Sequence, residues 1–236
     1  MATSKIGRVP TGISGFDKLC DGGLVSGSIN VIIGGPGSGK TIFLLQYLYN
    51  GATQYKENGA YISFEPDEAE LKLDAAEFGW DFEKLDKADK CKIIRISPKE
   101  GFREIKDEII RLIKKYNLKR VCFDPINILA FELERDKDIR EMIYDLTSAL
   151  AKENVTVLLA DEAIENNPSG GYVVGDADTR TTALKFLADG LISLYSSGLG
   201  GVSDRAVRIE KMRRTNHARG PQAFRITDKG ILVGGK

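Results

Sequence analysis

Short apolar runs alternate with amphipathic helical patterns along most of the chain. Runs of strand length lie at residues 29–33, 60–64, 92–96, 119–123, 155–160 and 190–195. Apolar positions at three- and four-residue spacing predict helices over residues 102–116 and 139–150. Strands separated by helices of this length favour right-handed β-α-β crossovers. We therefore expect an α/β fold with a mostly parallel twisted sheet flanked by helices.

The pattern changes after about residue 195. Short alternating strands with glycine turns follow, and the last two lie at residues 223–226 and 231–233. They predict a C-terminal antiparallel extension of the same sheet. The glycine-rich segment 196–201 is too short for a domain linker and indicates a hairpin turn. A chain of 236 residues is within the range of one α/β domain with a large core, and no internal repeat appears, so residues 1–236 are expected to form a single domain.

Residues 34–41 read Gly-Gly-Pro-Gly-Ser-Gly-Lys-Thr and fit the G-x-x-x-x-G-K-[ST] spacing of a phosphate-binding P-loop. The motif lies between an apolar strand and an apolar helix, as it requires. Glycines let many backbone N–H groups turn towards a triphosphate, and the helix adds its positive end. Lys40 is then expected to contact the β- and γ-phosphates, and the Thr41 hydroxyl to coordinate Mg²⁺. The predicted nucleotide-binding residues of this segment are Gly35, Pro36, Gly37, Ser38, Gly39, Lys40, Thr41 and Ile42.

Two carboxylates end predicted strands. Asp124 follows the apolar run Val121-Cys122-Phe123 and is the candidate Walker B acid for the metal, with a turn-initiating aspartate before Pro125 as the alternative. Glu65 ends the strand at residues 60–64 and is the candidate group that activates water. The same glutamate also suits the acidic first turn of a following helix, and the two roles are compatible.

A basic segment lies near the C-terminus. Residues 208–213 alternate, so Lys211 and Arg213 are expected to share one strand face about 7 Å apart. Two neighbouring cations repel unless an anion joins them, which favours a phosphate partner; a solvated basic edge strand is the alternative. His217 is the only histidine and follows in the same segment, where a surface role is the ordinary expectation.

Charge, cysteine content and hydropathy limit the kinds of partner and location to be expected for the protein. The 34 basic and 34 acidic residues cancel, so no overall positive field attracts nucleic acid or an anionic membrane. The three cysteines form no C-x-x-C pair and are expected to be reduced thiols. No apolar stretch approaches a membrane span, and the N-terminus lacks the apolar region of a signal peptide. A cytoplasmic protein is the expectation.

Several further blocks carry a family resemblance. They are residues 11–17 (Thr-Gly-Ile-Ser-Gly-Phe-Asp), the P-loop, Phe64-Glu65, Phe78-Gly79-Trp80, Asp124, the segment from Lys211 to His217, and residues 226–230 (Ile-Thr-Asp-Lys-Gly). Together they resemble a single-domain KaiC-like ATPase of the RecA superfamily. The resemblance implies a RecA-like fold, a homo-oligomer, usually a hexamer, and ATP with Mg²⁺ between neighbouring subunits.

The resemblance also assigns roles to residues. It implies that Glu65 polarises the attacking water and that Lys211 and Arg213 reach the γ-phosphate bound to the adjacent subunit. The resemblance also implies that the subunit that supplies Lys211 and Arg213 places four further residues near that nucleotide: Thr215, His217, Thr227 and Asp228.

The chain departs from the family pattern at two places. The paired glutamates of the cyanobacterial clock protein appear here as Glu65-Pro66, which implies slow hydrolysis. Its autophosphorylated Ser-Thr pair aligns near Lys185-Phe186, and Thr181 and Thr182 are close but not equivalent. No autokinase activity is therefore expected.

Three functions remain open. The first is an ATP-driven oligomeric switch read by an unknown protein partner. The second is a DNA-recombination ATPase, whose strand-binding loop would run from about 161 to 180. The carboxylates Asp161, Glu162, Glu165, Asp176 and Asp178 there face only Arg180, although a Ser169-Gly170-Gly171 turn and Tyr172 favour base stacking. The third is a nucleotide-gated scaffold with negligible turnover, which Pro66 favours.

Overall fold

The computed structural model describes residues 6–65, 67–97, 99, 101–130, 136–162, 179–198 and 204–234. Two strands, β1 (Arg8–Val9) and β2 (Leu24–Val25), form a small antiparallel pair. The main sheet is built from β3 (Ile29–Gly34), β4 (Gly59–Ser63), β5 (Cys91–Arg95), β6 (Arg120–Asp124), β7 (Thr156–Glu162), β8 (Gly190–Ser196), β9 (Arg205–Met212), β10 (Gln222–Thr227) and β11 (Gly230–Val233).

The order of the strands confirms the fold expected from the sequence. Over the described residues the main sheet has nine strands in the order β11-β10-β9-β8-β3-β7-β6-β4-β5. The strands from β8 to β5 are parallel, whereas β9, β10 and β11 extend the sheet in antiparallel pairing beyond β8. The protein is thus an α/β fold with a C-terminal antiparallel extension.

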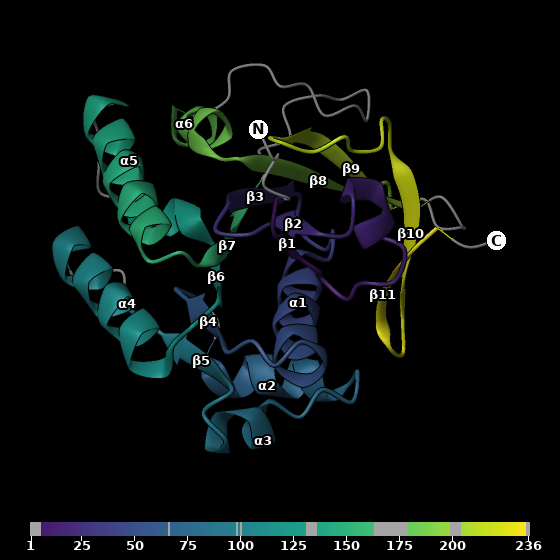
Figure 1. Cartoon of the computed structure of the whole chain (residues 1–236), viewed down its shortest axis with the longest axis horizontal. Helices are drawn as coiled ribbons and strands as arrows, with labels where there is room; N and C mark the ends of the chain where they lie inside the picture. The colour runs from purple at the N-terminus through teal and green to yellow at the C-terminus, as the bar shows by residue number, and fades with distance from the viewer. Residues whose placement is uncertain are drawn as a thin grey trace, which may run out of the picture.

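Helices cover both faces of the sheet (Figure 1). They are α1 (Lys40–Gln54), α2 (Glu68–Ala76), α3 (Phe82–Lys87), α4 (Phe102–Tyr116), α5 (Asp136–Lys152) and α6 (Thr179–Leu187), with 3₁₀ turns η1 (Asp17–Cys20) and η2 (Ile126–Ala130). Ile32, Cys122 and Leu158 belong to the core cluster that includes the α1 side chains. Their neighbours Val31, Phe123 and Leu159 belong to the cluster with α4 and α5. Because both faces are buried, the central strands are apolar along most of their length.

The first long strand lies in the middle of the sheet. β3 pairs with β7 on one side and with β8 on the other, and all three are parallel. In such sheets ligands bind beyond the carboxyl ends of the strands, where the strand order reverses. The loop after β3, which carries the P-loop sequence, lies at that point.

The predicted strands agree with the observed ones except at their ends. The predicted strand bounds move by one or two residues, and the two-residue strands β1 and β2 were missed because they carry no periodic pattern. β8 and β9 pair in antiparallel fashion as a hairpin requires, although residues 199–203 lie outside the described residues. Asp161 was expected in an acidic loop. This was wrong, because Asp161 is buried within β7.

Glu162 was expected in the same loop, and this was also wrong, because it is the exposed last residue of β7. Residues 163–178 of that proposed DNA-binding stretch are not described. Glu165, the Ser169-Gly170-Gly171 turn, Tyr172, Asp176 and Asp178 all lie outside the described residues, as does the side chain of Arg180. Within the described part of the chain, no helix combines the length and the apolar character needed to cross a bilayer.

The three cysteines provide a first testable prediction. Cys20, Cys91 and Cys122 are buried free thiols. Burial raises the pKa of Cys20 and of Cys91 to about 12, from an ordinary 9.0, and raises that of Cys122 as well. We expect no reaction with a disulfide reagent such as DTNB at pH 8 in the native protein and three reactive thiols after unfolding in guanidinium. A thiol that reacts rapidly in the native state would contradict this burial.

The same pKa shifts predict how the free energy of unfolding depends on pH. Above pH 9 the unfolded thiols ionise, whereas the buried Cys20 and Cys91 thiols keep their protons until about pH 12. The folded state then binds more protons than the unfolded state, so the free energy of unfolding should fall as the pH rises through this window.

Candidate functional site

The P-loop has the backbone geometry of an anion cradle. Gly37 and Gly39 have positive φ angles of 72° and 97°, which side-chain-bearing residues rarely adopt. A Cβ on Gly34 would lie 2.7 Å from the carbonyl oxygen of Leu194. No side chain caps α1, and Phe43 N–H donates to Gly39 C=O at 2.9 Å. The backbone N–H groups of the first turn therefore remain for a ligand.

Lys40 is folded back onto the loop. Its Nζ donates to the carbonyl oxygens of Gly34 at 2.7 Å and Gly35 at 3.2 Å, and the residue is buried. Burial lowers the pKa of Lys40, while the nearby carboxylates, Asp124 first among them, oppose that shift. The ammonium is thus held at the loop itself, where a candidate phosphate ligand would lie.

Thr41 and Asp124, the two candidate metal-binding residues, are in contact. Thr41 Oγ1 donates to Asp124 Oδ2 at 2.9 Å, which joins the first turn of α1 to the carboxyl end of β6. Tyr61, on β4, donates its hydroxyl to the same oxygen of Asp124. Burial raises the pKa of Asp124, whereas the hydrogen bonds from Tyr61 and Thr41 and the charge of Lys40 lower it. This is a cluster of oxygen donors of the kind that suits Mg²⁺.

Glu65 is linked to this cluster through the backbone of its neighbour Phe64. It follows the end of β4 and is exposed, and Pro66 next to it lies outside the described residues. The preceding Phe64 donates its N–H to the carbonyl oxygen of Asp124 at 3.1 Å, so the ends of β4 and β6 are tied together. Glu65 therefore starts from the same edge of the sheet as the P-loop and Asp124.

Lys211 and Arg213 converge, but not on one strand face as expected, because β9 ends at Met212 and Arg213 lies beyond it. Lys211 Nζ donates to the carbonyl oxygens of Lys185, Phe186 and Ala188 at 3.1, 3.3 and 2.7 Å. Arg213 donates to the same Phe186 carbonyl at 3.4 Å and pairs with Asp189 at 3.8 Å. Within one chain, the negative partners that join the two cations are thus the C-terminal end of α6 and one carboxylate.

A β-bulge gives Lys211 this direction. Val207 and Ile209 are buried, and strict alternation would also bury Lys211. The pairing of β8 with β9 shifts between Leu191 and Ile192, and the next buried residue of β9 is Met212. A bulge changes the phase of the strand, so Lys211 turns out of the core towards α6.

The remaining candidates lie in the C-terminal part of the chain. Thr215 Oγ1 accepts a hydrogen bond from Arg8 at 2.7 Å, and His217 Nδ1 lies 3.0 Å from its neighbour's carbonyl oxygen. Thr227 donates to Gly230 C=O at 2.9 Å, and Asp228 pairs with Lys229 at 3.7 Å. In the described chain these residues form no hydrogen bond with the P-loop, Asp124 or Glu65.

Sequence reasoning missed two residues at the site. Tyr61 looked like an ordinary core residue of a strand, and nothing in its spacing indicates where its hydroxyl points. Arg205, on β9, donates to the carbonyl oxygen of Gly37 at 3.2 Å. Only the pairing of β9 beyond β8 brings it near the P-loop, and that pairing has no local sequence signal.

Comparisons with known proteins agree with this geometry. The family described as "ATPase: KaiC" matches residues 9–236. Circadian clock oscillator proteins KaiC of Parathermosynechococcus lividus and Synechococcus elongatus are 31% and 30% identical over 97% of this chain. The matches cover 42% and 44% of those proteins, so the chain spans less than half the length of these relatives.

A solved structure matches almost end to end. The crystal structure of a KaiC-like protein from the archaeon Pyrococcus horikoshii OT3 superposes with a TM-score of 0.84 and 34% sequence identity. The match covers 98% of this chain and 100% of that one. The P-loop, the Thr41–Asp124 contact and this agreement over nearly the whole sequence lead to one conclusion: the chain belongs to the KaiC ATPase family.

Proposed function

We propose that this protein hydrolyses Mg²⁺-bound ATP between the subunits of a homo-oligomer, most simply a hexamer, and acts as a regulatory switch. One observation carries the proposal. The P-loop, Thr41 and Asp124 gather at one edge of the sheet, whereas Lys211 and Arg213 converge at the end of α6. In an oligomer, Lys211 and Arg213 of a second copy would approach the phosphates of the nucleotide. The P-loop, Thr41 and Asp124 of the first copy would bind that nucleotide and its metal.

The residues at the P-loop fit ATP and Mg²⁺. Glycines with positive φ and the free N–H groups of the first turn of α1 suit phosphate oxygens. The Thr41 hydroxyl and the Asp124 carboxylate are hard oxygen ligands for the metal or for its bound water. Bound there, Mg²⁺ would neutralise part of the phosphate charge that develops during hydrolysis.

The side chains of this chain would then divide the work. Lys40 would transfer its hydrogen bonds from the Gly34 and Gly35 carbonyls to phosphate oxygens. Glu65 would orient a water molecule and accept its proton. Arg213 and Lys211, together with Thr215, His217, Thr227 and Asp228, would approach the nucleotide from the neighbouring subunit.

The contacts of Lys211 suggest how nucleotide state could be read out. To reach a phosphate of a neighbour, Lys211 must release at least part of the α6 C-terminus. Since cations stabilise the C-terminal end of a helix, this exchange would loosen α6 in one nucleotide state and not in the other. A protein partner that contacts α6 would then distinguish the two states.

Phosphate release and oligomer mass test the proposal together. We expect Mg²⁺-dependent release of phosphate from ATP and an ATP-dependent increase in mass by light scattering. Arg213→Ala should lower turnover roughly 100-fold or more, because a trans-acting cation at the phosphate stabilises the transition state. Arg214→Ala is the matched control, since both arginines are 53% exposed and both pair with Asp189.

The control should keep turnover within about threefold of wild type, because an exposed ion pair contributes little. Equal losses in the two variants would contradict a specific role for Arg213. Tight ATP binding without phosphate release in the wild type would support the nucleotide-gated scaffold instead.

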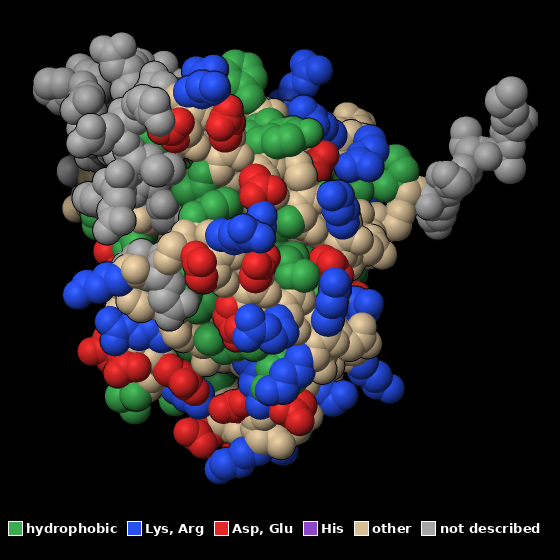
Figure 2. Space-filling model, turned by 90° about the vertical axis from the view of Figure 1, so that its left-hand side faces the viewer, with side chains coloured by type: hydrophobic (Ala, Val, Ile, Leu, Met, Phe, Trp, Pro, Cys, Tyr) green, Lys and Arg blue, Asp and Glu red, His purple; other side chains and the backbone are tan. Residues whose placement is uncertain are grey.

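The described residues do not favour the remaining activities. Figure 2 shows Lys, Arg, Asp and Glu side chains interspersed on the face that it presents, without a basic area for a nucleic acid backbone. A salt-sensitive shift with single-stranded DNA would revive the recombination hypothesis. Lys185 and Phe186 carry no hydroxyl for autophosphorylation, and Phe186 is 74% exposed at the end of α6.

A further inference from the structure

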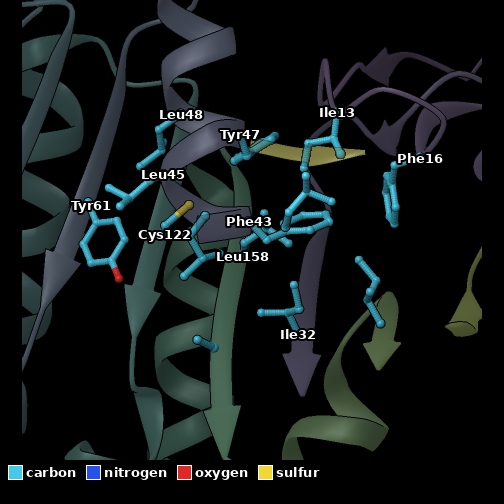
Figure 3. Packing of buried hydrophobic residues seen from close by; sticks show 14 of the residues in the cluster. Ile13, Phe16, Ile32, Phe43, Leu45, Tyr47, Leu48, Tyr61, Cys122 and Leu158 are labelled. Atoms are coloured by element: carbon cyan, nitrogen blue, oxygen red, sulfur yellow. The ribbon is translucent and has the colours of Figure 1, made fainter. Parts of the chain in front are cut away.

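The Tyr61 hydroxyl is committed to one acceptor at the candidate metal site. Tyr61 is fully buried on β4, and its hydroxyl donates to Asp124 Oδ2. Figure 3 shows the ring lying beside α1 with its oxygen pointing towards the carboxyl ends of the strands. Because the ring is buried, the hydroxyl oxygen cannot move away from Asp124 without repacking the core.

The sheet register brings the tyrosine to this acceptor. Tyr61 pairs with Cys122, and Asp124 lies two residues further along β6 on the same face. Two residues of a strand span roughly 7 Å, a distance that a tyrosine side chain can bridge. A phenylalanine at this position would fill the same core volume but could not reach Asp124 with a hydrogen bond.

The hydrogen bond fixes the orientation of the carboxylate. The terminal torsion of an aspartate is broad, so a carboxylate needs partners to hold it in one orientation. Asp124 Oδ2 accepts hydrogen bonds from both Tyr61 and Thr41, at 2.9 Å for Thr41. Among the described residues, neither donor binds Oδ1, which leaves that oxygen for a metal or its bound water.

We propose that Tyr61 is a positioning residue for Mg²⁺, which holds Asp124 through its hydroxyl so that the other carboxylate oxygen faces the metal. This inference rests on the proposed function. Groups that orient a metal ligand from behind commonly change metal affinity 10- to 100-fold when they are removed. The hydroxyl of Tyr61 is such a group.

The chain offers a matched control. Tyr47, on α1, is also fully buried, and its hydroxyl has no hydrogen-bond partner among the described residues. Figure 3 shows Tyr47 and Tyr61 in the same core cluster. Tyr47→Phe therefore removes a buried hydroxyl of the same kind without touching Asp124.

The test titrates a non-hydrolysable ATP analogue, AMPPNP, into wild type, Tyr61→Phe and Tyr47→Phe, first in Mg²⁺ and then in EDTA. We expect equal affinities in EDTA, within about twofold. For each variant, the gain is the ratio of the AMPPNP affinity in Mg²⁺ to that in EDTA. This gain should be about tenfold smaller in Tyr61→Phe than in wild type and unchanged in Tyr47→Phe. In an Asp124→Asn background, Tyr61→Phe should have no further effect on that gain.

Turnover provides the second measurement. In phosphate-release assays the half-saturating free Mg²⁺ concentration should rise about tenfold in Tyr61→Phe, and the maximal rate should return to within about threefold of wild type.

Three results would overturn the role of Tyr61. They are an unchanged Mg²⁺-dependent gain, an equal loss of affinity in Mg²⁺ and EDTA, and a lower maximal rate at an unchanged Mg²⁺ requirement. A wild-type protein with no Mg²⁺-dependent gain would overturn the proposed function itself, and the role of Tyr61 with it.

Discussion

Glu65→Gln is expected to abolish ATP hydrolysis and to leave ATP binding in place. Glutamine keeps the size of the side chain but cannot accept a proton from water. General-base catalysis commonly contributes 10²- to 10⁴-fold, so phosphate release should fall roughly 100-fold or more. Glu65 is exposed and follows β4. Its replacement should therefore leave the core and the phosphate cradle intact, and binding of a fluorescent ATP analogue should change less than about threefold.

Asp67→Asn is the control for this substitution. It makes the same acid-to-amide change two residues further along the same loop. Asp67 caps α2 by accepting a hydrogen bond from Glu68 N–H at 2.6 Å, and asparagine caps helices equally well. Turnover in Asp67→Asn should stay within about twofold of wild type. If Glu65→Gln behaves like this control, Glu65 is not the base, and its acidity serves only the helix start.

The candidate phosphate site could be found from the sequence because its residues are contiguous. The P-loop lies within eight residues, and its glycines encode the backbone directions that phosphate needs. Asp124 was also predictable, because it ends an apolar strand and a parallel sheet brings the ends of its strands to one edge. The observed Thr41–Asp124 hydrogen bond joins the P-loop to the acid at the end of this strand.

The contacts of Tyr61, Arg205 and Lys211 could not be predicted in the same way. Each contact depends on which strands are neighbours and on the register in which they pair. Hydrophobic alternation predicts neither the order of the strands nor their register. The β9 bulge illustrates the difficulty, since one additional residue reverses which side chains face the core. Alternation correctly indicated a strand around Lys211 but not that its ammonium would bind the end of α6.

Outside the candidate site, a buried arginine joins β6 to α1. Arg120, at the start of β6, is fully buried and donates from Nε to Glu57 at 2.7 Å and from Nη1 to the Tyr47 carbonyl at 3.0 Å. Its guanidinium carbon lies 4.5 Å from the centre of the Tyr47 ring and 5.2 Å from that of Tyr55. A Cβ on Gly51 would lie 2.5 Å from Arg120 Cδ, so α1 approaches closely over the arginine.

Arg120→Met is expected to lower the free energy of unfolding by about 3 kcal/mol, measured by guanidinium denaturation. Breaking a buried ion pair by removing one partner costs roughly 3 to 5 kcal/mol. The lower end applies because Glu57 is 29% exposed and can regain water, while the Tyr47 carbonyl loses a donor. Lys119→Met, an exposed lysine next to Arg120, removes the same charge and should cost less than about 0.5 kcal/mol.

A double variant separates the two possible causes of that loss. If the cost of Arg120→Met comes from a carboxylate left without its partner, adding Glu57→Leu should restore about 1 kcal/mol or more, because paired apolar replacements of buried ions are often neutral. If the cost comes from lost packing over Tyr47 and Tyr55, the double variant should stay as unstable as the single one. A single variant as stable as Lys119→Met would show that Arg120 is not needed to hold α1 against the sheet.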